Sequence, residues 1–584
     1  MKRFVILAAI CCISMAHAEA PYTSGIFILN EDWYGHENST INHLSSQGQF
    51  SYRIIREENK ATCLSLGGTS SYGTIYGDRF YFICKQENSP GNNSQWKGGR
   101  VVVTDAKTMK VIYSIPTIFE ANGVSAADGR AFVGVDEAKG YIGTDNGIFV
   151  LNLTTGKIEK RITGTENPLL RNSNNKTSVS ATYYNQIGTM LRAYDYVFAI
   201  QQDKGIHIIN PETDEIITTI AGCFSTMVQS KDGRIWAARN TNRNAQNYPY
   251  GQSGALWQGN ELLCINPVTL EQTAFNIARM SGIQNLVVEQ TWYAWTAGSL
   301  CASTTENALF FSFNPNISDW YNGRTHIYRY DIDDNAVSEI FDVAAEDDLK
   351  DFYIYNSGIV RVSPHNGNLY VGCFHKEVSG PNWIFLQLST QGELVHVFKP
   401  IEHYWYPSLF IFPDMFAPEV KDFTPATVNV GQTIELPLKN MATDRDNFPA
   451  SITKRVLAVS DSSALSAVVR RDTLFITAHA NTTQSASVTV RFNSNGQLVD
   501  KTLSVLINKD ITSSPSTSAA SVALYTHNRR LFISGITQSA IVSVFDMTGR
   551  VVSSTYATGD ICLPLPQGIY IVRIGTRTHR IIIQ

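Results

Sequence analysis

The sequence lacks a surplus of either charge. It holds 47 Lys and Arg residues against 51 Asp and Glu residues, for a net charge of −4. Proteins that bind nucleic acid usually carry a basic excess or a basic stripe. The near balance therefore argues against nucleic acid as a partner.

Long apolar runs are absent after the first residues, so no transmembrane segment is expected in the mature chain. The start, "MKRFVILAAICCISMAHA", joins two basic residues to a short apolar stretch and an Ala-x-Ala site. This pattern predicts a secretory signal peptide over residues 1–18. Because Ile10 stands where a lipoprotein signal would have a small residue before Cys11, no lipid anchor is expected.

Cysteine is scarce. Two of the nine cysteines lie in the predicted signal peptide, and the other seven show no spacing typical of a disulfide framework or a metal site. Cys84, Cys264 and Cys373 lie inside apolar, strand-like runs. We expect these three to be buried thiols that act as small apolar side chains.

Familiar catalytic motifs are missing as well: the chain has no H-E-x-x-H, P-loop, G-x-S-x-G or paired C-x-x-C. "DIDDNAVSEIFD" begins like a calcium loop at Asp331 but lacks its sixth-position glycine and ends in Asp342, which favours a hairpin turn. "SKDGRIW" is similar to a sialidase turn but places Gly233 directly after Asp232, which favours an ordinary strand-to-strand turn. No catalytic residue, metal or cofactor is predicted, although acidic residues could still converge in space as in glycoside hydrolases.

A repeated hairpin is what the sequence does contain. Seven copies pair two alternating strands across an Asn/Asp/Pro/Thr/Gly turn, as in "GIFVLNLTTGKIEKRI" and "GIHIINPETDEIITTI". A second hairpin precedes most copies, so each unit has four strands, and even repetition of such units predicts a seven-bladed β-propeller over residues 22–416. The first unit lacks its opening strand, and "PSLFIFPD" (residues 407–414) is expected to supply it and close the ring.

Turns such as "INPETDEII" and "SKDGRIW" resemble those of the YVTN/NHL-like propellers of secreted bacterial proteins. The resemblance implies the fold and says almost nothing about function, because propellers host many unrelated activities.

Aromatic residues recur in the loops that a propeller would project onto one face. In "NEDWYGHENS" (residues 30–39) Trp33, Tyr34 and His36 follow one another closely, and Asn, Gln and Ser accompany most of the other loop aromatics. Rigid aromatic surfaces with amide neighbours suit an uncharged, polar or planar ligand. The predicted ligand-binding residues are Trp33, Tyr34, His36, Trp96, Tyr248, Tyr250, Trp292, Trp295, Trp320, Tyr321, Trp383, Tyr404 and Trp405. The alternative is packing between blades, which is favoured for Trp236 and Trp257.

The sequence pattern of the C-terminal third differs from that of the repeated hairpins. Short strands over residues 418–508 resemble an Ig-type, cadherin/dystroglycan-like sandwich. Asp444 and Asp446 match an acidic motif that ligates calcium in some members of that family. The other acidic motifs that complete such a calcium site are not evident in the sequence. Residues 509–521 form a Ser/Thr-rich linker. Residues 522–584 resemble the C-terminal sorting domain of type IX secretion cargo. The residues that match its pattern are Asp546, Gly549, Arg550, Gly568, Tyr570 and Arg573.

The sequence therefore predicts an all-β protein, exported to the cell surface, the outer membrane or the medium, or to the periplasm if the tail is not a sorting signal. Some surface propellers of this general type capture corrinoids for an outer-membrane transporter. This resemblance makes a corrinoid one candidate ligand of a non-enzymatic propeller, with a glycan fragment as the other. A glycan lyase or hydrolase using the same face, and an adhesion or scaffold protein binding a protein partner, remain the alternatives.

Overall fold

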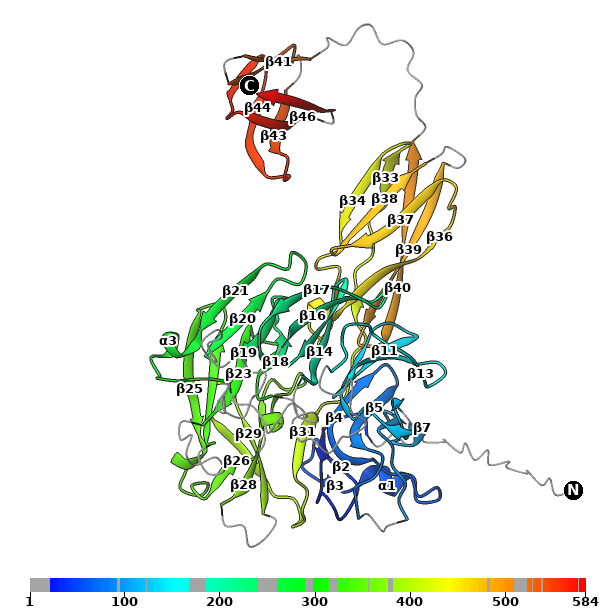
Figure 1. Ribbon diagram of the computed structural model, residues 1–584, viewed down its shortest axis with the longest axis vertical. Coiled ribbons are helices and arrows are strands. Elements are labelled where there is room, and N and C mark those ends of the chain that lie inside the picture. Colours follow the sequence, from blue (N-terminus) through cyan, green and yellow to red (C-terminus); the bar gives the residue numbers. More distant parts are fainter. Residues whose placement is uncertain are drawn as a thin grey trace, which may run out of the picture. The chain divides into compact units, whose positions relative to one another are not determined.

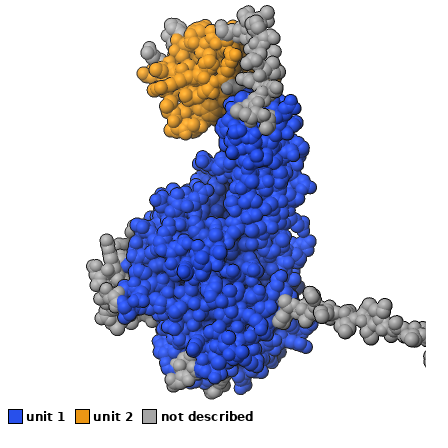
Figure 2. Space-filling model, turned by 90° about the vertical axis from the view of Figure 1, so that its right-hand side faces the viewer, with its two compact units in different colours: residues 1–508 blue, residues 509–584 orange. Residues whose placement is uncertain are grey.

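The computed structural model describes residues 22–91, 95–121, 123–167, 185–202, 204–239, 260–288, 298–314, 324–355, 357–376, 382–479, 484–508, 522–527, 529–536, 539–575 and 577–583. The chain forms two compact units, residues 1–508 and 509–584 (Figure 2). The predicted signal peptide, the 509–521 linker, Tyr248, Tyr250, Trp257, Trp292, Trp295, Trp320 and Tyr321 lie outside the described residues.

Seven antiparallel sheets follow one another through the first unit, which confirms the predicted all-β fold and its seven blades (Figure 1). From inner to outer strand they are: blade 1, β31 (Pro407–Ile411), β1 (Ile26–Asn30), β2 (Thr40–Leu44), β3 (Phe50–Ser51); blade 2, β4 (Gly68–Tyr76), β5 (Arg79–Gln86), β6 (Val101–Asp105), β7 (Val111–Ile115); blade 3, β10 (Gly129–Gly134), β11 (Lys139–Thr144), β12 (Gly147–Asn152), β13 (Lys157–Arg161); blade 4, β14 (Ile187–Ala193), β15 (Tyr196–Gln201), β16 (Gly205–Asn210), β17 (Glu215–Ala221). The remaining three are: blade 5, β18 (Phe224–Gln229), β19 (Ile235–Arg239), β20 (Glu261–Ile265), β21 (Gln272–Asn276); blade 6, β22 (Cys301–Ala302), β23 (Ala308–Phe313), β24 (His326–Asp331), β25 (Ala336–Asp342); blade 7, β26 (Phe352–Ile354) with β27 (Val360–Val362), then β28 (Leu369–His375), β29 (Trp383–Leu388), β30 (Leu394–Phe398).

Only short elements interrupt the blades in the described chain. They are α1 (Ile54–Glu58), α3 (Ile277–Ser281), the single 3₁₀ turns η2 (Val343–Ala345) and η3 (Ser357–Ile359), and the small hairpin of β8 (Glu120–Ala121) and β9 (Val124–Ser125). Among the described residues, no helix has the length and apolar character that a membrane span requires.

One turn chemistry explains the repeated hairpin. At the end of β12, Oδ1 of Asn152 accepts hydrogen bonds from the backbone N–H groups of Thr154 and Thr155, at 3.0 and 2.9 Å. Asp331 of the calcium-like stretch does the same for the two residues after Ile332, which places it in a hairpin turn as predicted. A side chain that accepts from the backbone two and three residues on fixes a tight turn. The Asn/Asp recurrence in the sequence is therefore structural.

The ring closes as the sequence predicts. β31 pairs antiparallel with β1, with Ile28 opposite Phe410 and Leu29 opposite Leu409. The hydroxyl of Ser408 donates to the carbonyl oxygens of Leu29 and Ser70, at 3.2 and 3.1 Å, so it joins the first two blades. Cys84, Cys264 and Cys373 are buried free thiols, and burial raises the pKa of each, as expected for apolar surroundings.

A β-sandwich follows the propeller within the same unit. One sheet has the order β33-β40-β39-β36 and the other β34-β38-β37, with β33 and β40 parallel; β32 and β35 form a separate pair. The strands are β32 (Glu419–Val420), β33 (Ala426–Asn429), β34 (Thr433–Pro437), β35 (Ala442–Thr443), β36 (Thr453–Val459), β37 (Leu465–Arg470), β38 (Thr473–Ala478), β39 (Ser485–Ser494) and β40 (Gln497–Asn508), with the 3₁₀ turn η4 (Pro449–Ser451) before β36.

The sandwich packs against the turns that join the first two strands of blades 2, 3 and 4. The N–H of Tyr194 donates to the carbonyl of Ala450 at 2.9 Å, and the N–H of Gly77 donates to that of Asn495 at 2.8 Å. Glu137 pairs with Arg455 and Arg491, at 2.8 and 3.0 Å. These turns lie on the face opposite the loops that join second to third strands, so the sandwich leaves that other face uncovered.

The acidic D-x-D-N piece lies at the same junction. The carboxylate of Asp446 accepts hydrogen bonds from the backbone N–H groups of Met415 and Phe416, just after β31. Asp414 accepts from the side-chain amides of Asn495 and Gln497, at 2.6 and 3.0 Å, and burial raises its pKa to about 7. These carboxylates fix the segment that leaves the propeller to the sandwich that follows.

The second unit contains two small sheets. They comprise β41 (Ala523–His527), β42 (Arg530–Ser534) and β45 (Ile561–Pro564) in one sheet, and β44 (Val551–Ala557), β43 (Ala540–Asp546), β46 (Gly568–Ile574) and β47 (Arg577–Ile583) in the other. Asp546 accepts backbone hydrogen bonds from Thr548 and Arg550, and Gly549 has a φ of 84° in the same turn. The D-x-x-G-R stretch is thus a hairpin turn between β43 and β44.

Candidate functional site

The loop over residues 31–39, which joins β1 to β2, is anchored to the segment before β31. The N–H groups of Glu31 and Asp32 donate to the carbonyl oxygens of Tyr406 and Trp405, at 2.9 and 3.0 Å. Asp32 has a φ of 56°, which turns the chain at that point. Two loops far apart in the sequence are therefore joined by backbone hydrogen bonds at the first blade.

An exposed stack of three rings stands on these two loops. The ring centroids of Trp33 and His36 are 3.7 Å apart, and those of Trp33 and Tyr404 are 4.5 Å apart. Trp33 is 41% exposed and Tyr404 38% exposed, and His36 and Tyr34 are exposed as well. We call Trp33, His36 and Tyr404 the ring stack. It presents aromatic surface to solvent, as a binding face requires, and ligand binding by these residues stays a prediction.

Trp383 and Trp405 differ from that expectation. They are 3% and 1% exposed and lie in a cluster of aromatic residues between blades 7 and 1. Nε1 of Trp405 donates to the carbonyl of Ile401 at 3.0 Å, and its ring stacks on Tyr52 with centroids 5.5 Å apart. Trp383 begins β29, so strand geometry turns its side chain into the core. The two tryptophans support the loops from below and present no ring to solvent.

A charged network lies against the buried tryptophan. Nε2 of His403 is 2.7 Å from Oε1 of Glu37, 3.5 Å from Oδ1 of Asp32 and 2.9 Å from Nη2 of Arg53. Arg56 donates to Glu37 at 3.1 Å and to the carbonyl of Asn38 at 2.7 Å. The guanidinium of Arg53 also lies over the ring of Trp405, 5.3 Å from its centroid. Asp32, Glu37, Arg53, Arg56 and His403 form what we call the charge network.

The pKa values of Asp32, Glu37 and His403 are all shifted. Hydrogen bonds that His403 donates to the carboxylates of Asp32 and Glu37 raise the pKa of His403 to about 9, so its imidazole is charged at neutral pH. Burial raises the pKa of Asp32 to about 6 against the effect of His403. Burial would raise the pKa of Glu37 too, but the hydrogen bond with His403 and the charge of Arg53 outweigh it and lower the pKa to about 2. Glu37 is therefore a firmly ionised carboxylate.

The ligand atoms of Asp32, Glu37 and His403 lie within 4.8 Å of one another, close enough to hold a metal ion. Their negative charge is, however, already balanced by the imidazolium and by the guanidinium groups of Arg53 and Arg56. Buried charges paired in this way stabilise one arrangement of the loops that carry them. We therefore assign the charge network to positioning the ring stack.

The second blade adds to the same face. The N–H of Gly35 donates to Oγ of Ser89 at 2.9 Å, and the side chains of Asn38 and Asn88 are bonded at 2.9 Å. The guanidinium of Arg56 lies 5.9 Å from the ring centroid of Trp96. Trp96 thus belongs to the same face as the ring stack, next to the charge network. Of the thirteen predicted residues, the described chain brings together Trp33, Tyr34, His36, Trp96 and Tyr404.

Sequence reasoning missed the charge network as a unit. Asp32 and Glu37 stand inside the same loop as Trp33, which is the available signal, but Arg53 and His403 are 350 residues apart in the sequence. A second feature was also missed: a cavity of about 340 Å³ in the central channel, with Arg361 in its wall.

Comparison with known proteins gives a family and remote structural likenesses. The model of a family described as a domain of unknown function (DUF5074) matches residues 24–413. No curated protein matches the chain.

Three solved structures illustrate the likenesses. A quinonprotein alcohol dehydrogenase-like protein from Bacteroides thetaiotaomicron is 15% identical, with 67% of this chain and 79% of that chain covered and a TM-score of 0.43. The extracellular domain of a putative hybrid two-component system from the same organism is 12% identical, with 84% and 56% covered and a TM-score of 0.35. PorZ, a surface component of the type IX secretion system of Porphyromonas gingivalis, is 10% identical, with 93% and 89% covered and a TM-score of 0.21. None of these likenesses assigns a function.

Proposed function

The chain belongs to the DUF5074 family, and we propose that its propeller is a non-enzymatic ligand-binding module that captures a small polar or planar ligand on the ring stack. One observation supports this most directly: the exposed ring of Trp33 stacks on His36 and lies against the tilted ring of Tyr404, on loops whose backbones are hydrogen-bonded to each other. Preorganised aromatic surface reduces the entropy lost when a planar ligand binds. A corrinoid and a glycan fragment are the two ligand classes proposed.

The carboxylates beside the ring stack favour binding over glycoside hydrolysis. Oxygens of Asp32 and Glu37 lie within 4.8 Å of each other and share His403. This spacing argues against hydrolases that invert configuration, whose carboxyl groups lie about 6.5–9.5 Å apart, while it is close to the about 5–5.5 Å of those that retain it. Asp32 is also fully buried as a side chain, so a sugar cannot lie between the two groups in this arrangement.

The test measures affinity on variants of the ring stack. Intrinsic tryptophan fluorescence is titrated with cyanocobalamin and with a panel of neutral oligosaccharides, and the variants are Trp33→Ala and Tyr404→Ala. We expect each to weaken the binding of one of these classes by roughly five- to hundred-fold, which corresponds to about 1–3 kcal/mol for the loss of a stacked aromatic anchor.

Tyr556→Ala is the matched control, because Tyr556 is an exposed aromatic residue of the second unit. It should bind as the wild type does. Equal affinity in the ring-stack variants and the control would refute the proposal. Turnover of an oligosaccharide would establish the enzyme alternative instead. If neither cyanocobalamin nor any oligosaccharide binds, a protein partner would be favoured.

We further propose that residues 1–18 direct export and that residues 522–584 act as a sorting signal for the type IX route, which would deliver the propeller to the cell surface. An outer-membrane transporter or another surface complex is then the partner that receives the ligand. The support is the sequence pattern at both ends, together with a second unit that folds into its own two sheets.

Deletion of residues 521–584 tests this proposal in a host with the type IX apparatus. We expect the shortened protein to accumulate in the periplasm, because the signal peptide remains while the sorting signal is gone. Cell fractionation with surface protease digestion measures the distribution. An unchanged melting temperature of the first unit is the control for folding, and an unchanged amount at the surface would show that the second unit is no sorting signal.

A further inference from the structure

The central channel of the propeller holds a cavity of about 340 Å³. Its wall is built by the inner strands of all seven blades: β31, β4, β10, β14, β18, β22 and β27. Asp446 and Phe448, which precede η4 in the sandwich, also line it. The volume falls within the range of small-molecule sites, about 300–1,000 Å³. The cavity is distinct from the ring stack, which lies on the outer loops of blade 1.

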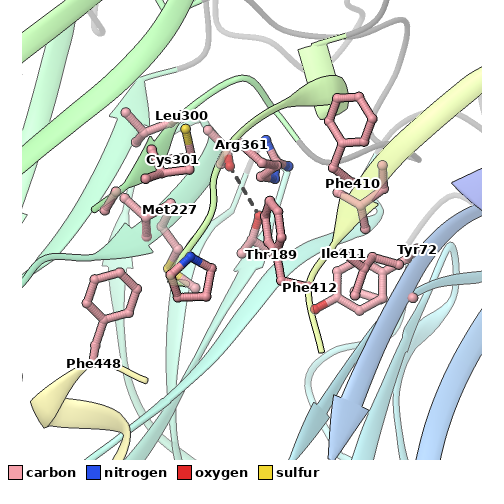
Figure 3. A pocket seen from close by; sticks show the side chains of 18 of the residues that line it. Tyr72, Thr189, Met227, Leu300, Cys301, Arg361, Phe410, Ile411, Phe412 and Phe448 are labelled. Atoms are coloured by element: carbon pink, nitrogen blue, oxygen red, sulfur yellow. Dashed lines mark hydrogen bonds between the residues drawn. The ribbon is translucent and has the colours of Figure 1, made fainter. Parts of the chain in front are cut away.

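Most of the wall is apolar. Met227 and Leu300 lie on one side of the cavity in Figure 3, and Phe410 and Phe412 lie on the other, with Phe448 below. The hydroxyl groups of Thr189 and Thr226 lie 3.4 Å apart in the same wall. A molecule in this cavity would therefore need an apolar body.

Two arginines stand in this wall, and Arg130 donates to the side chain of Gln186 and to the carbonyl of Gly129. Arg361 is the other. It stands on β27 and reaches the cavity, and it keeps part of its surface accessible although it is surrounded by the ring of strands. Both of its hydrogen bonds are made by Nη1, to the carbonyl oxygens of Val360 and Gly298, at 2.7 and 3.1 Å. Within the described chain, no carboxylate forms an ion pair with it, and its Nε and Nη2 groups have no protein acceptor.

The one carboxylate in the described wall, Asp446, is engaged through one of its two oxygens. That oxygen accepts from the backbone N–H groups of Met415 and Phe416, while the other has no hydrogen-bond partner and lies 3.8 Å from Nε2 of His365. The charged and polar groups that act on Arg361 are Cys301 and Tyr72, and burial lowers its pKa. A guanidinium remains charged in proteins, so Arg361 stays a cation that is partly accessible and has no counter-ion among the described residues. Charged groups with little access to water are normally paired.

We propose that the channel cavity binds a small organic anion, a carboxylate with an apolar body, whose acid group is held by Arg361. The free Nε and Nη2 groups offer the parallel pair of N–H donors that a carboxylate accepts. The thioether and phenyl groups of the wall then contact the body of the ligand. This site is independent of the ring stack, so either proposal can fail without the other.

The experiment compares two probes with the same carbon skeleton. Wild-type protein is titrated with 3-phenylpropionate and with 3-phenylpropan-1-ol, and the melting temperature and calorimetric heat are followed. We expect the acid to raise the melting temperature and to bind at least ten-fold more tightly than the alcohol. Equal binding of the two, or no effect of the acid, would overturn the proposal. Inorganic phosphate should have little effect, and a shift as large as that of the acid would overturn the requirement for an apolar body.

Arg361→Met identifies the residue. This change keeps an unbranched side chain and removes the charged guanidinium, so it should weaken acid binding on the order of ten- to hundred-fold, the scale for losing charged hydrogen bonds. If Arg361→Met does not fold, Arg361→Lys serves instead, because it keeps the charge but not the paired N–H donors. Its affinity for 3-phenylpropionate should still fall several-fold.

Arg192→Met is the matched control. Arg192 is another arginine of an inner strand, its Nη1 donates to the carbonyl oxygens of Tyr194 and Tyr196, and it lines a neighbouring hollow outside this cavity. The control should bind 3-phenylpropionate as the wild type does. Equal weakening in Arg361→Met and Arg192→Met would mean that the effect is a general loss of folding, and the proposal would fall.

Discussion

A chain that ends at Tyr406, directly before β31, is expected to lose the cooperative unfolding of its propeller. β31 brings Leu409, Phe410 and Ile411 into the core of blade 1. At about 1.5–3 kcal/mol for each buried side chain, the lost burial alone amounts to roughly 5–9 kcal/mol, which is comparable to the whole stability of many proteins. The measurement is urea unfolding followed by tryptophan fluorescence.

A chain that ends at Ala417 is the control, because it keeps β31 and lacks the sandwich and everything after it. It should unfold cooperatively at a urea concentration well above that of the shorter chain. A synthetic peptide of residues 404–417 should restore part of the lost stability to the chain that ends at Tyr406, since the missing strand can pair with β1. Identical unfolding curves for the two truncated chains would refute the role of β31.

Replacing the buried tryptophans should cost more stability than replacing the exposed one. Trp405→Ala and Trp383→Ala are each expected to lower the free energy of unfolding by about 3–5 kcal/mol, because each leaves a large void in the aromatic cluster between blades 7 and 1. Trp33→Ala should change it by about 0.5 kcal/mol or less, as expected of a surface position. Urea unfolding of the three variants measures these differences.

Trp405→Phe separates packing from hydrogen bonding. It keeps an aromatic ring against Tyr52 but loses the bond from Nε1 to the carbonyl of Ile401, so its loss should be smaller than that of Trp405→Ala. A Trp33→Ala variant that loses as much stability as Trp405→Ala would contradict the division into an exposed stack and a buried layer. The ring stack would then be part of the core.

The blades were predictable because their cause is local. Alternating apolar residues recur in every hairpin, and an Asn or Asp such as Asn152 closes the turn in blades 2 to 6, where it needs no distant partner. Ser45 and Ser389 take that place in blades 1 and 7. Closure by β31 followed from counting the strands in each unit. The first unit lacked its opening strand, and one extra strand remained after the seventh unit. Those inferences depend only on periodicity and order along the chain.

The positions of the aromatic residues were harder to predict. Trp33 and Trp405 both stand in aromatic, polar loop sequences, yet one is exposed and the other buried, because the burial of a loop residue depends on which neighbouring loop covers it. The contact between Arg53 and His403 was equally hard to predict, because the two residues are 350 positions apart in the sequence and meet only when the ring closes. Arg361 did have a local signal, a single charge within the apolar run "GIVRV", which marks a charged side chain on an inner strand.

The pairing of β1 with β31 has a consequence for the order of events during folding. The hydroxyl of Ser408 and the carbonyl of Leu29 that it bonds are 379 residues apart, so this contact has one of the largest loop-closure costs in the chain. Until residues 407–411 arrive, β1 offers an unpaired edge to any other strand nearby. An exported chain would therefore hold an incomplete first blade during folding until β31 pairs with β1. We therefore expect blade 1 to be the last to acquire protection from hydrogen exchange and the main site of early aggregation.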